Sequence, residues 1–139
     1  MGSKQNAALE NFNNGYNCCQ SVILALAPED YSKDQIVRIS TGFGGGMGQE
    51  QEVCGAVSGA IMALGLKYGG TAENVPVTYG KVRELMKQFK EERGSIYCRK
   101  LLGCNLKTEE GKEYRKKHNL RETVCCECVK TATGLAESL

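Results

Sequence analysis

The stretch that decides the fold is residues 42–66, which read GFGGGMGQEQEVCGAVSGAIMALGL. Five of its first seven residues are glycine, too many for a helix, so we predict a loop or turn there. The apolar run 53–66 that follows predicts a buried helix. In this run Gly55, Gly59 and Ala63 stand four apart, which gives a smooth stripe that a second helix can approach closely.

Helical periodicity continues on both sides of this stretch, and no window alternates as a strand does. Further helices are predicted over residues 4–14, 17–27, 32–39, 78–93, 95–103 and 121–137, with 108–118 as a charged helix or loop and 71–77 as a linker around Pro76. The length of 139 residues suits one domain. We therefore expect an all-α fold: a single-domain compact helical bundle over residues 1–139, with about five to seven helices.

Charge is unevenly distributed along the chain. Between Lys81 and Arg121 there are thirteen Lys and Arg residues against six Asp and Glu, and the remainder holds five against ten. This indicates either solvated helix faces or a positive surface near an anionic group or partner. Aromatic residues are sparse in the basic segment, so we expect no nucleic-acid binding. His118 lies in a basic stretch and is expected at the surface.

The chain has eight cysteines: Cys18, Cys19, Cys54, Cys98, Cys104, Cys125, Cys126 and Cys128. Its first residues are polar rather than a secretory signal, and the 53–66 run is too short to span a bilayer. We therefore expect a cytoplasmic protein without membrane insertion. Structural disulfides are rare in that compartment, so the cysteines favour metal binding or thiol redox chemistry.

Cys54 is the candidate redox thiol. It lies behind the glycine loop at the start of the predicted buried helix, where unpaired N–H groups and the helix dipole favour an anion. Such a position predicts a thiolate with a lowered pKa, which is the reactive and metal-binding form. The alternative is a small core residue that packs beside Gly55 and Gly59.

Cys125 and Cys128 form a C-x-x-C pair on one turn of the last predicted helix, on its apolar face. The pair can chelate a metal, close a strained disulfide, or simply pack in the core. Cys18 and Cys19 diverge by about 100° on their helix, so we expect only one of them to serve a site.

The cysteine spacing matches neither a zinc finger nor a ferredoxin. A shared site would therefore be assembled by the tertiary fold, with one ligand from each of several helices. Ligation by cysteine alone points to zinc or an iron–sulfur cluster. The glycine loop lacks both the G-x-G-x-x-G and the P-loop pattern, so no nucleotide cofactor is expected.

Several segments, taken in order, resemble the C_GCAxxG_C_C family of redox-active proteins. They are Asn17-Cys18 with Gln20-Ser21-Val22, the 42–48 loop, Cys54-Gly55-Ala56-Val57-Ser58-Gly59, Ser95-x-x-Cys98-Arg99-x-Leu101-Leu102-Gly103 and the late Cys125. The resemblance implies four characteristic cysteines, which are Cys18, Cys54, Cys98 and Cys125. It also implies an anaerobic bacterial or archaeal setting, often near transporter genes, and a kinship with the terminal domain of split-Soret cytochromes, which carries an iron–sulfur site. Where the family usually has Cys-Pro, this chain has Cys125-Cys126.

Three functions remain open at this point. The four cysteines can form one iron–sulfur cluster or zinc site, with Cys104 and Cys128 as additional ligands. They can instead form a thiol–disulfide couple that exchanges electrons with a redox partner, with Cys54 as the nucleophile. The third alternative is a non-catalytic helical module with core cysteines that docks a partner such as a transporter-associated protein. The oligomeric state is open, with a homodimer as one alternative.

Overall fold

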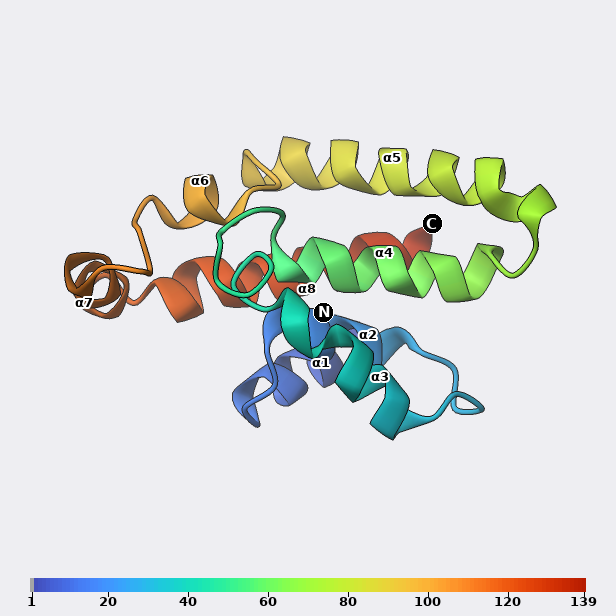
Figure 1. The fold of residues 1–139 in the computed structure, drawn as a ribbon, viewed down its shortest axis with the longest axis horizontal. Coiled ribbons are helices and arrows are strands. Elements are labelled where there is room, and N and C mark those ends of the chain that lie inside the picture. The colour runs from blue at the N-terminus through green and yellow to red at the C-terminus, as the bar shows by residue number, and fades with distance from the viewer. Residues whose placement is uncertain (1) are drawn as a thin grey trace.

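The computed structural model describes residues 2–139, which form eight α-helices and no strand (Figure 1). The α-helices are α1 (Ser3–Asn13), α2 (Cys18–Leu26), α3 (Lys33–Ser40), α4 (Gly55–Tyr68), α5 (Val75–Arg93), α6 (Cys98–Leu102), α7 (Glu109–Lys117) and α8 (Cys126–Ser138). Two 3₁₀ turns, η1 (Thr41–Phe43) and η2 (Ala72–Asn74), and the π-helical turn η3 (Arg121–Cys125) complete them. No helix in the described part of the chain is both long and apolar enough to cross a membrane.

The all-α prediction is confirmed, but five to seven helices was too low an estimate. The charged segment 108–118 forms the helix α7, although it has no apolar stripe that would have predicted it. Its start is fixed by Thr108, whose hydroxyl accepts a hydrogen bond from the N–H of Gly111 at 3.0 Å. Local capping therefore decides a helix that hydrophobic periodicity left undecided.

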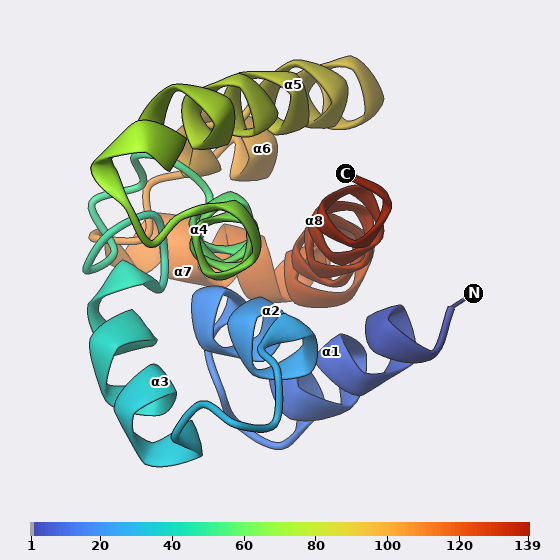
Figure 2. The same cartoon turned by 90° about the vertical axis from the view of Figure 1, so that its right-hand side faces the viewer.

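Helix α4 is the central element of the bundle. Helices α2, α5 and α8 all pack against it, and Figure 2 shows α4 nearly end-on between them. Helix α1 covers α2 and α8, and α3 lies on the outer side of α2. The largest fully buried side chains come from α2, α4, α5 and α8 and include Val22, Ile23, Val57, Leu64, Leu85, Phe89 and Val129.

A second helix approaches the small-residue stripe of α4 closely, as predicted, and that helix is α2. A Cβ atom on Gly59 would lie 2.6 Å from the carbonyl oxygen of Cys19 and 3.1 Å from the Cβ of Val22. A side chain at this position would force the two helices apart. The close approach of α2 and α4 brings the start of α2 beside the start of α4, and this is where the site lies.

Helix α5 begins at Val75, so the prediction of a linker over 71–77 and a helix from 78 was wrong. Pro76 caused the error because proline breaks the interior of a helix. In the first turn, however, the missing N–H has no partner to lose and the fixed φ suits the helix. Gly94 ends α5 in the left-handed conformation, with φ at 92°.

The glycine-rich loop contains a left-handed turn. All five residues from Gly45 to Gln49 have positive φ, Met47 and Gln49 among them. Several backbone hydrogen bonds close the turn, among them those from the N–H of Gln51 to the carbonyl of Gly45 at 3.0 Å and from the N–H of Glu52 to that of Gly46 at 2.9 Å. Non-glycine residues resist this conformation, so the surrounding contacts must hold the loop in place.

The last helical segment is not one continuous α-helix, as 121–137 was predicted to be. Its first turn, Arg121–Cys125, is π-helical, and the α-helix α8 follows from Cys126. A π-turn adds a residue to the helical repeat and is frequently found at functional sites. Here it lies directly before Cys126 and carries Cys125, one of the predicted site residues.

Candidate functional site

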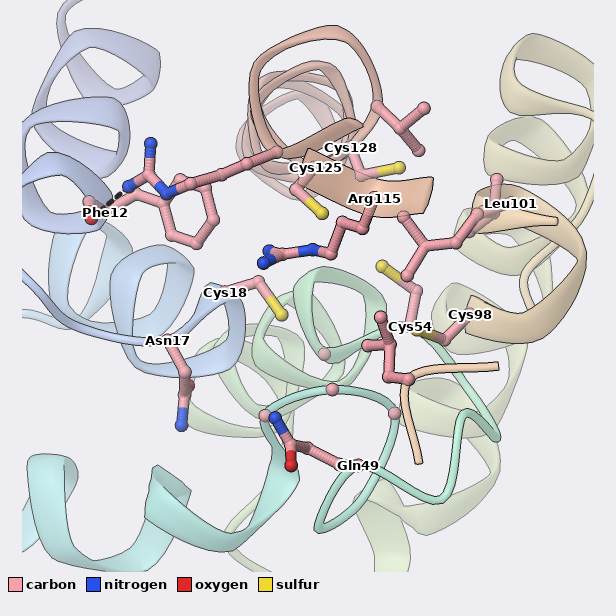
Figure 3. A pocket seen from close by; sticks show the side chains of 18 of the residues that line it. Phe12, Asn17, Cys18, Gln49, Cys54, Cys98, Leu101, Arg115, Cys125 and Cys128 are labelled. Atoms are coloured by element: carbon pink, nitrogen blue, oxygen red, sulfur yellow. Dashed lines mark hydrogen bonds between the residues drawn. The ribbon is translucent and has the colours of Figure 1, made fainter. Parts of the chain in front are cut away.

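Five of the eight cysteines line one cavity of about 740 Å³ (Figure 3). They include the four that the family resemblance implies, Cys18, Cys54, Cys98 and Cys125. Cys128, predicted as an additional ligand, is the fifth. The remaining wall is formed by the glycine loop, by apolar side chains and by the polar residues Asn17, Thr41, Gln49, Lys112, Arg115 and Arg121.

Each of the four predicted thiols reaches the cavity from a different helical segment. Cys18 is the first residue of α2, and Asn17 caps that helix by accepting the N–H of Gln20 at 2.9 Å. Cys54 is the N-cap residue of α4, which confirms its predicted place behind the loop at the start of the buried helix. Cys98 begins α6, and Cys125 ends the π-turn.

A short backbone bridge ties Cys54 to Cys98. Val53 and Tyr97 form an isolated antiparallel bridge. Next to it, the N–H of Cys54 donates to the carbonyl of Ile96 at 2.7 Å, and the N–H of Cys98 donates to that of Glu52 at 2.8 Å. The bridge fixes the two cysteines relative to each other, although 44 positions separate them in the sequence.

Two glycines leave room for two of the sulfur-bearing side chains. A Cβ atom on Gly55 would overlap the Sγ of Cys18. A Cβ atom on Gly46 would lie 2.9 Å from the Cβ of Cys98 and 2.7 Å from the backbone nitrogen of Glu52. The glycines of the loop and of α4 therefore shape the walls around the cysteines as well as allow the turn.

The thiols of the cavity hold their protons tightly. The pKa of Cys18 is raised well above the usual range, first by its interaction with Cys54 and then by burial. Burial, with the neighbouring Cys125 and Cys18, raises the pKa of Cys98 to about 12. Burial also raises the pKa of Cys125, and the Arg115 guanidinium opposes that rise.

The predicted low pKa of Cys54 needs correction. Its pKa is raised, chiefly through the interaction with the Cys128 thiol, with burial adding to the effect. The N–H of Ala56 at the helix start does lower the pKa, as the dipole argument expected, but this contribution is smaller. The Cys18 thiol also lowers the pKa of Cys54, but the Cys128 thiol and burial together outweigh both lowering contributions.

One basic side chain enters the cavity. Figure 3 shows the guanidinium of Arg115, from α7, between the sulfurs of Cys18 and Cys125. The Nε of Arg115 is buried and has no hydrogen-bond partner among the described residues. No Asp or Glu side chain of the described chain lines the cavity. Neither periodicity nor motif identifies Arg115 as a site residue in the sequence. It is one of several basic residues in a polar segment, and nothing in its spacing distinguishes it from the others.

The other three cysteines and the histidine lie elsewhere. Cys104, predicted as an additional ligand, lines a separate hollow beside Gln51 and Lys107. Cys19 is buried against Met62, with the two sulfurs 4.0 Å apart. Cys126 is half-buried outside the cavity wall, and all eight thiols are free. His118 is exposed, as predicted, and its ring lies 4.2 Å from that of Tyr114.

The donor set of the cavity is chemically suited to a thiophilic metal centre. It consists of cysteine sulfurs alone, which select zinc or iron–sulfur clusters over hard cations. Across residues 2–139, however, no group of three or more His, Cys, Asp or Glu side chains is arranged to hold a single metal ion. The thiols are instead distributed around the walls of the cavity.

Comparison with known proteins assigns the family. No match was found among curated proteins, and none among solved structures. The family model described as "Putative redox-active protein (C_GCAxxG_C_C)" matches residues 16–139, which is nearly the whole chain and contains all eight cysteines. The resemblance seen in the sequence is therefore confirmed, and the chain belongs to the C_GCAxxG_C_C family of redox-active proteins.

Proposed function

We propose that the cavity holds an iron–sulfur cluster ligated by Cys18, Cys54, Cys98 and Cys125, and that the chain exchanges electrons with a redox partner through it. The observation that carries this proposal is the convergence of these four thiols, from four separate helical segments, on one cavity. No carboxylate or imidazole side chain of residues 2–139 lines that cavity. A cluster would supply a one-electron couple at this position. The family's redox description agrees with such a role.

The arrangement favours a cluster over a single zinc ion. A structural zinc site needs four ligands around one point, each about 2.0–2.3 Å from the metal. No three of the candidate side chains are placed in that way in the described chain. A cluster contains several metal atoms, and its thiolate ligands are spread correspondingly wider. A cavity of about 740 Å³ has room for such a group.

The raised pKa values of the cavity thiols also favour a metal centre over thiol–disulfide exchange. Thiol–disulfide exchange needs a thiolate, and the pKa of Cys54 is raised rather than lowered. Bound metal ions reverse this situation because a cation stabilises the thiolates that the bare cavity disfavours. The second candidate is a dithiol–disulfide couple between Cys54 and Cys128, since both thiols line the cavity and the Cys128 thiol contributes most to the raised pKa of Cys54.

The test is anaerobic isolation of the protein, followed by assay of iron, zinc and acid-labile sulfide and by a visible absorption spectrum. We expect iron and sulfide in a fixed ratio to protein and a charge-transfer band in the visible. Single replacement of Cys18, Cys54, Cys98 or Cys125 by alanine should remove most of the iron and sulfide. The matched control is Cys104→Ala, which removes a thiol outside the cavity and should retain both.

Zinc without iron would overturn the cluster proposal. Metal-free protein in which mild oxidation by diamide links Cys54 to Cys128 would favour the dithiol couple instead. Cluster content that is lost equally in Cys104→Ala and Cys54→Ala would contradict the assignment of the cavity.

A further inference from the structure

We infer that Arg115 is the counter-charge of the thiolate centre and raises its reduction potential. Its guanidinium lies between the sulfurs of Cys18 and Cys125 (Figure 3). This inference rests on the proposed function, because it assigns to one residue the tuning of the centre that the cavity is proposed to hold.

The first observation is that Arg115 has no charge partner of its own. None of the six ion pairs in the described chain involves it, and its Nε is buried without a hydrogen-bond partner. Arg115 as a whole is half-buried, and a cationic nitrogen that is removed from water without a hydrogen-bond partner is costly. The bare cavity therefore contains a positive charge that nothing fixed in the chain balances.

The second observation is the charge of the cavity wall as a whole. Its charged side chains are Lys112, Arg115 and Arg121, and no carboxylate lines it within residues 2–139. Thiols that hold their protons are neutral and cannot balance this charge. Four metal-bound thiolates can, because each carries a negative charge that the metal only partly offsets. The cavity is thus electrostatically complementary to an anionic centre.

The other two cations of the wall are already engaged. Arg121 donates from its Nη2 to the carbonyl of Phe12 at 2.8 Å and pairs with Glu122 at 3.2 Å. Lys112 is exposed and pairs with Glu109 at 3.4 Å. Arg115 alone combines a place among the sulfurs with an unpartnered donor, so it is the residue whose charge acts most strongly on the centre.

The direction of the effect follows from electrostatics. One-electron reduction adds a negative charge to the centre, and a fixed cation beside it stabilises the reduced state over the oxidised one. Arg115 therefore raises the reduction potential. Hydrogen bonds to the sulfurs and nearby charge are the levers by which proteins tune such centres.

The experiment is redox titration of the anaerobically loaded wild type and of Arg115→Met, Arg115→Lys and Arg99→Met. Methionine keeps an apolar stem without the charge, and lysine keeps the charge. Arg99→Met removes the same charge from an exposed side chain that pairs with Glu52 and lies outside the cavity. We expect Arg115→Met to lower the equilibrium constant for reduction at least tenfold, which is about 59 mV for a one-electron couple. Arg115→Lys should stay closer to wild type, and Arg99→Met should not shift.

A second readout uses the metal-free protein. If Arg115 served only to pack the cavity, Arg115→Met would lower the midpoint of denaturant unfolding in the metal-free and the loaded protein alike. As a counter-charge it destabilises the empty cavity, so Arg115→Met should leave the metal-free midpoint unchanged or raise it while the loaded protein loses iron faster to a chelator. A fall in the metal-free midpoint would overturn the inference.

The outcomes separate the two proposals. Wild-type protein without iron and sulfide overturns the cluster, and with it the role of Arg115. A loaded wild type whose potential is unchanged in Arg115→Met overturns only the inference, as does an equal shift in Arg99→Met. If the Arg115→Met protein does not take up the cluster, the inference requires that Arg115→Lys still takes it up and that Arg115→Gln does not. Equal cluster content in these last two variants would also overturn the inference.

Discussion

The sulfur of Cys18 occupies the space that a Cβ atom on Gly55 would need. Gly55 follows directly after Cys54, so the first turn of α4 provides one thiol of the site and leaves room for another. The family motif around this glycine therefore has a steric meaning in this chain, because the residue next to one cysteine must be small for a second cysteine to approach.

Gly55→Ala should destabilise the protein and impair the site. The added methyl group would also lie 2.9 Å from the carbonyl oxygen of Phe43, so relief requires movement of the backbone. Overpacking of this kind costs about 1–3 kcal/mol. Denaturant unfolding of the metal-free protein measures it, and iron content of the loaded protein should fall in parallel. Gly65→Ala is the control in the same helix: it meets nothing within 4 Å and should stabilise by roughly 0.5–1 kcal/mol. Equal effects of the two changes would contradict this steric account.

Gly46→Ala should cost more stability than Gly48→Ala. Both glycines have positive φ, at 69° and 56°, so alanine suffers a backbone penalty of about 1–2 kcal/mol at either position. Only Gly46 faces the Cβ of Cys98, whereas Gly48 has nothing within 4 Å. A Cβ atom on Gly46 would also meet the backbone of Gln51 and Glu52, so the difference between the two unfolding free energies measures the close packing of Gly46 against Cys98 and this backbone. If Gly48→Ala proves equally costly, the loop matters for its conformation alone.

Gln51 should be a structural clamp between the glycine loop and the segment after α6. It is 5% exposed, its Nε2 donates to the carbonyl of Cys104 at 2.8 Å, and its Oε1 accepts the N–H of Leu106 at 2.8 Å. Gln51→Ala leaves the N–H of buried Leu106 without a partner, which should cost about 1–3 kcal/mol, and also removes the partly buried hydrogen bond to the carbonyl of Cys104. Gln49→Ala is a matched control, because Gln49 is exposed and its φ of 64° is close to the 58° of Gln51. A loss in Gln49→Ala as large as in Gln51→Ala would argue against the clamp.

The metal-free, reduced protein should lose stability as the pH rises above about 8.5, the pKa of an unfolded thiol. Cys98, with a folded pKa of about 12, keeps its proton in that range while the unfolded chain releases it. The unfolded state then binds fewer protons, so the free energy of unfolding falls by about 1.4 kcal/mol per pH unit for each such thiol. Unfolding between about pH 8 and about pH 10 tests this, and Cys98→Ala should show a shallower slope. A free energy of unfolding that is constant or rises over this range would contradict it.

Much of the fold follows from local patterns. The stripe of small residues in α4 predicts close packing against another helix, although not which one, and the cluster of glycines predicts the loop before it. Pro76 misleads because proline both ends and begins helices, and the sequence pattern alone does not show that Pro76 lies in the first turn of α5. Helix α7 depends on its cap at Thr108, which is too weak a signal to decide between helix and loop from sequence.

The membership of the site is less predictable than its chemistry. The order of motifs in the chain is enough to nominate Cys18, Cys54, Cys98 and Cys125 as a group. The spacing of three already puts Cys128 on the same helix face as Cys125, whereas the place of Cys104 outside the cavity depends on the route of the chain after α6. The direction of the Cys54 pKa shift could not be foreseen either, because it is set by a thiol 74 residues away in the chain.

The central claim is that thiolates in this cavity bind a centre of more than one iron atom. X-ray absorption at the iron edge of the anaerobically loaded protein tests it most directly, because it reports the atoms that surround the metal. We predict that the first shell of atoms around iron contains sulfur only and that the second shell contains iron. Both shells should be lost in Cys54→Ala and kept in Cys104→Ala. Iron surrounded by oxygen or nitrogen, or a single metal atom without a neighbouring iron, would contradict it.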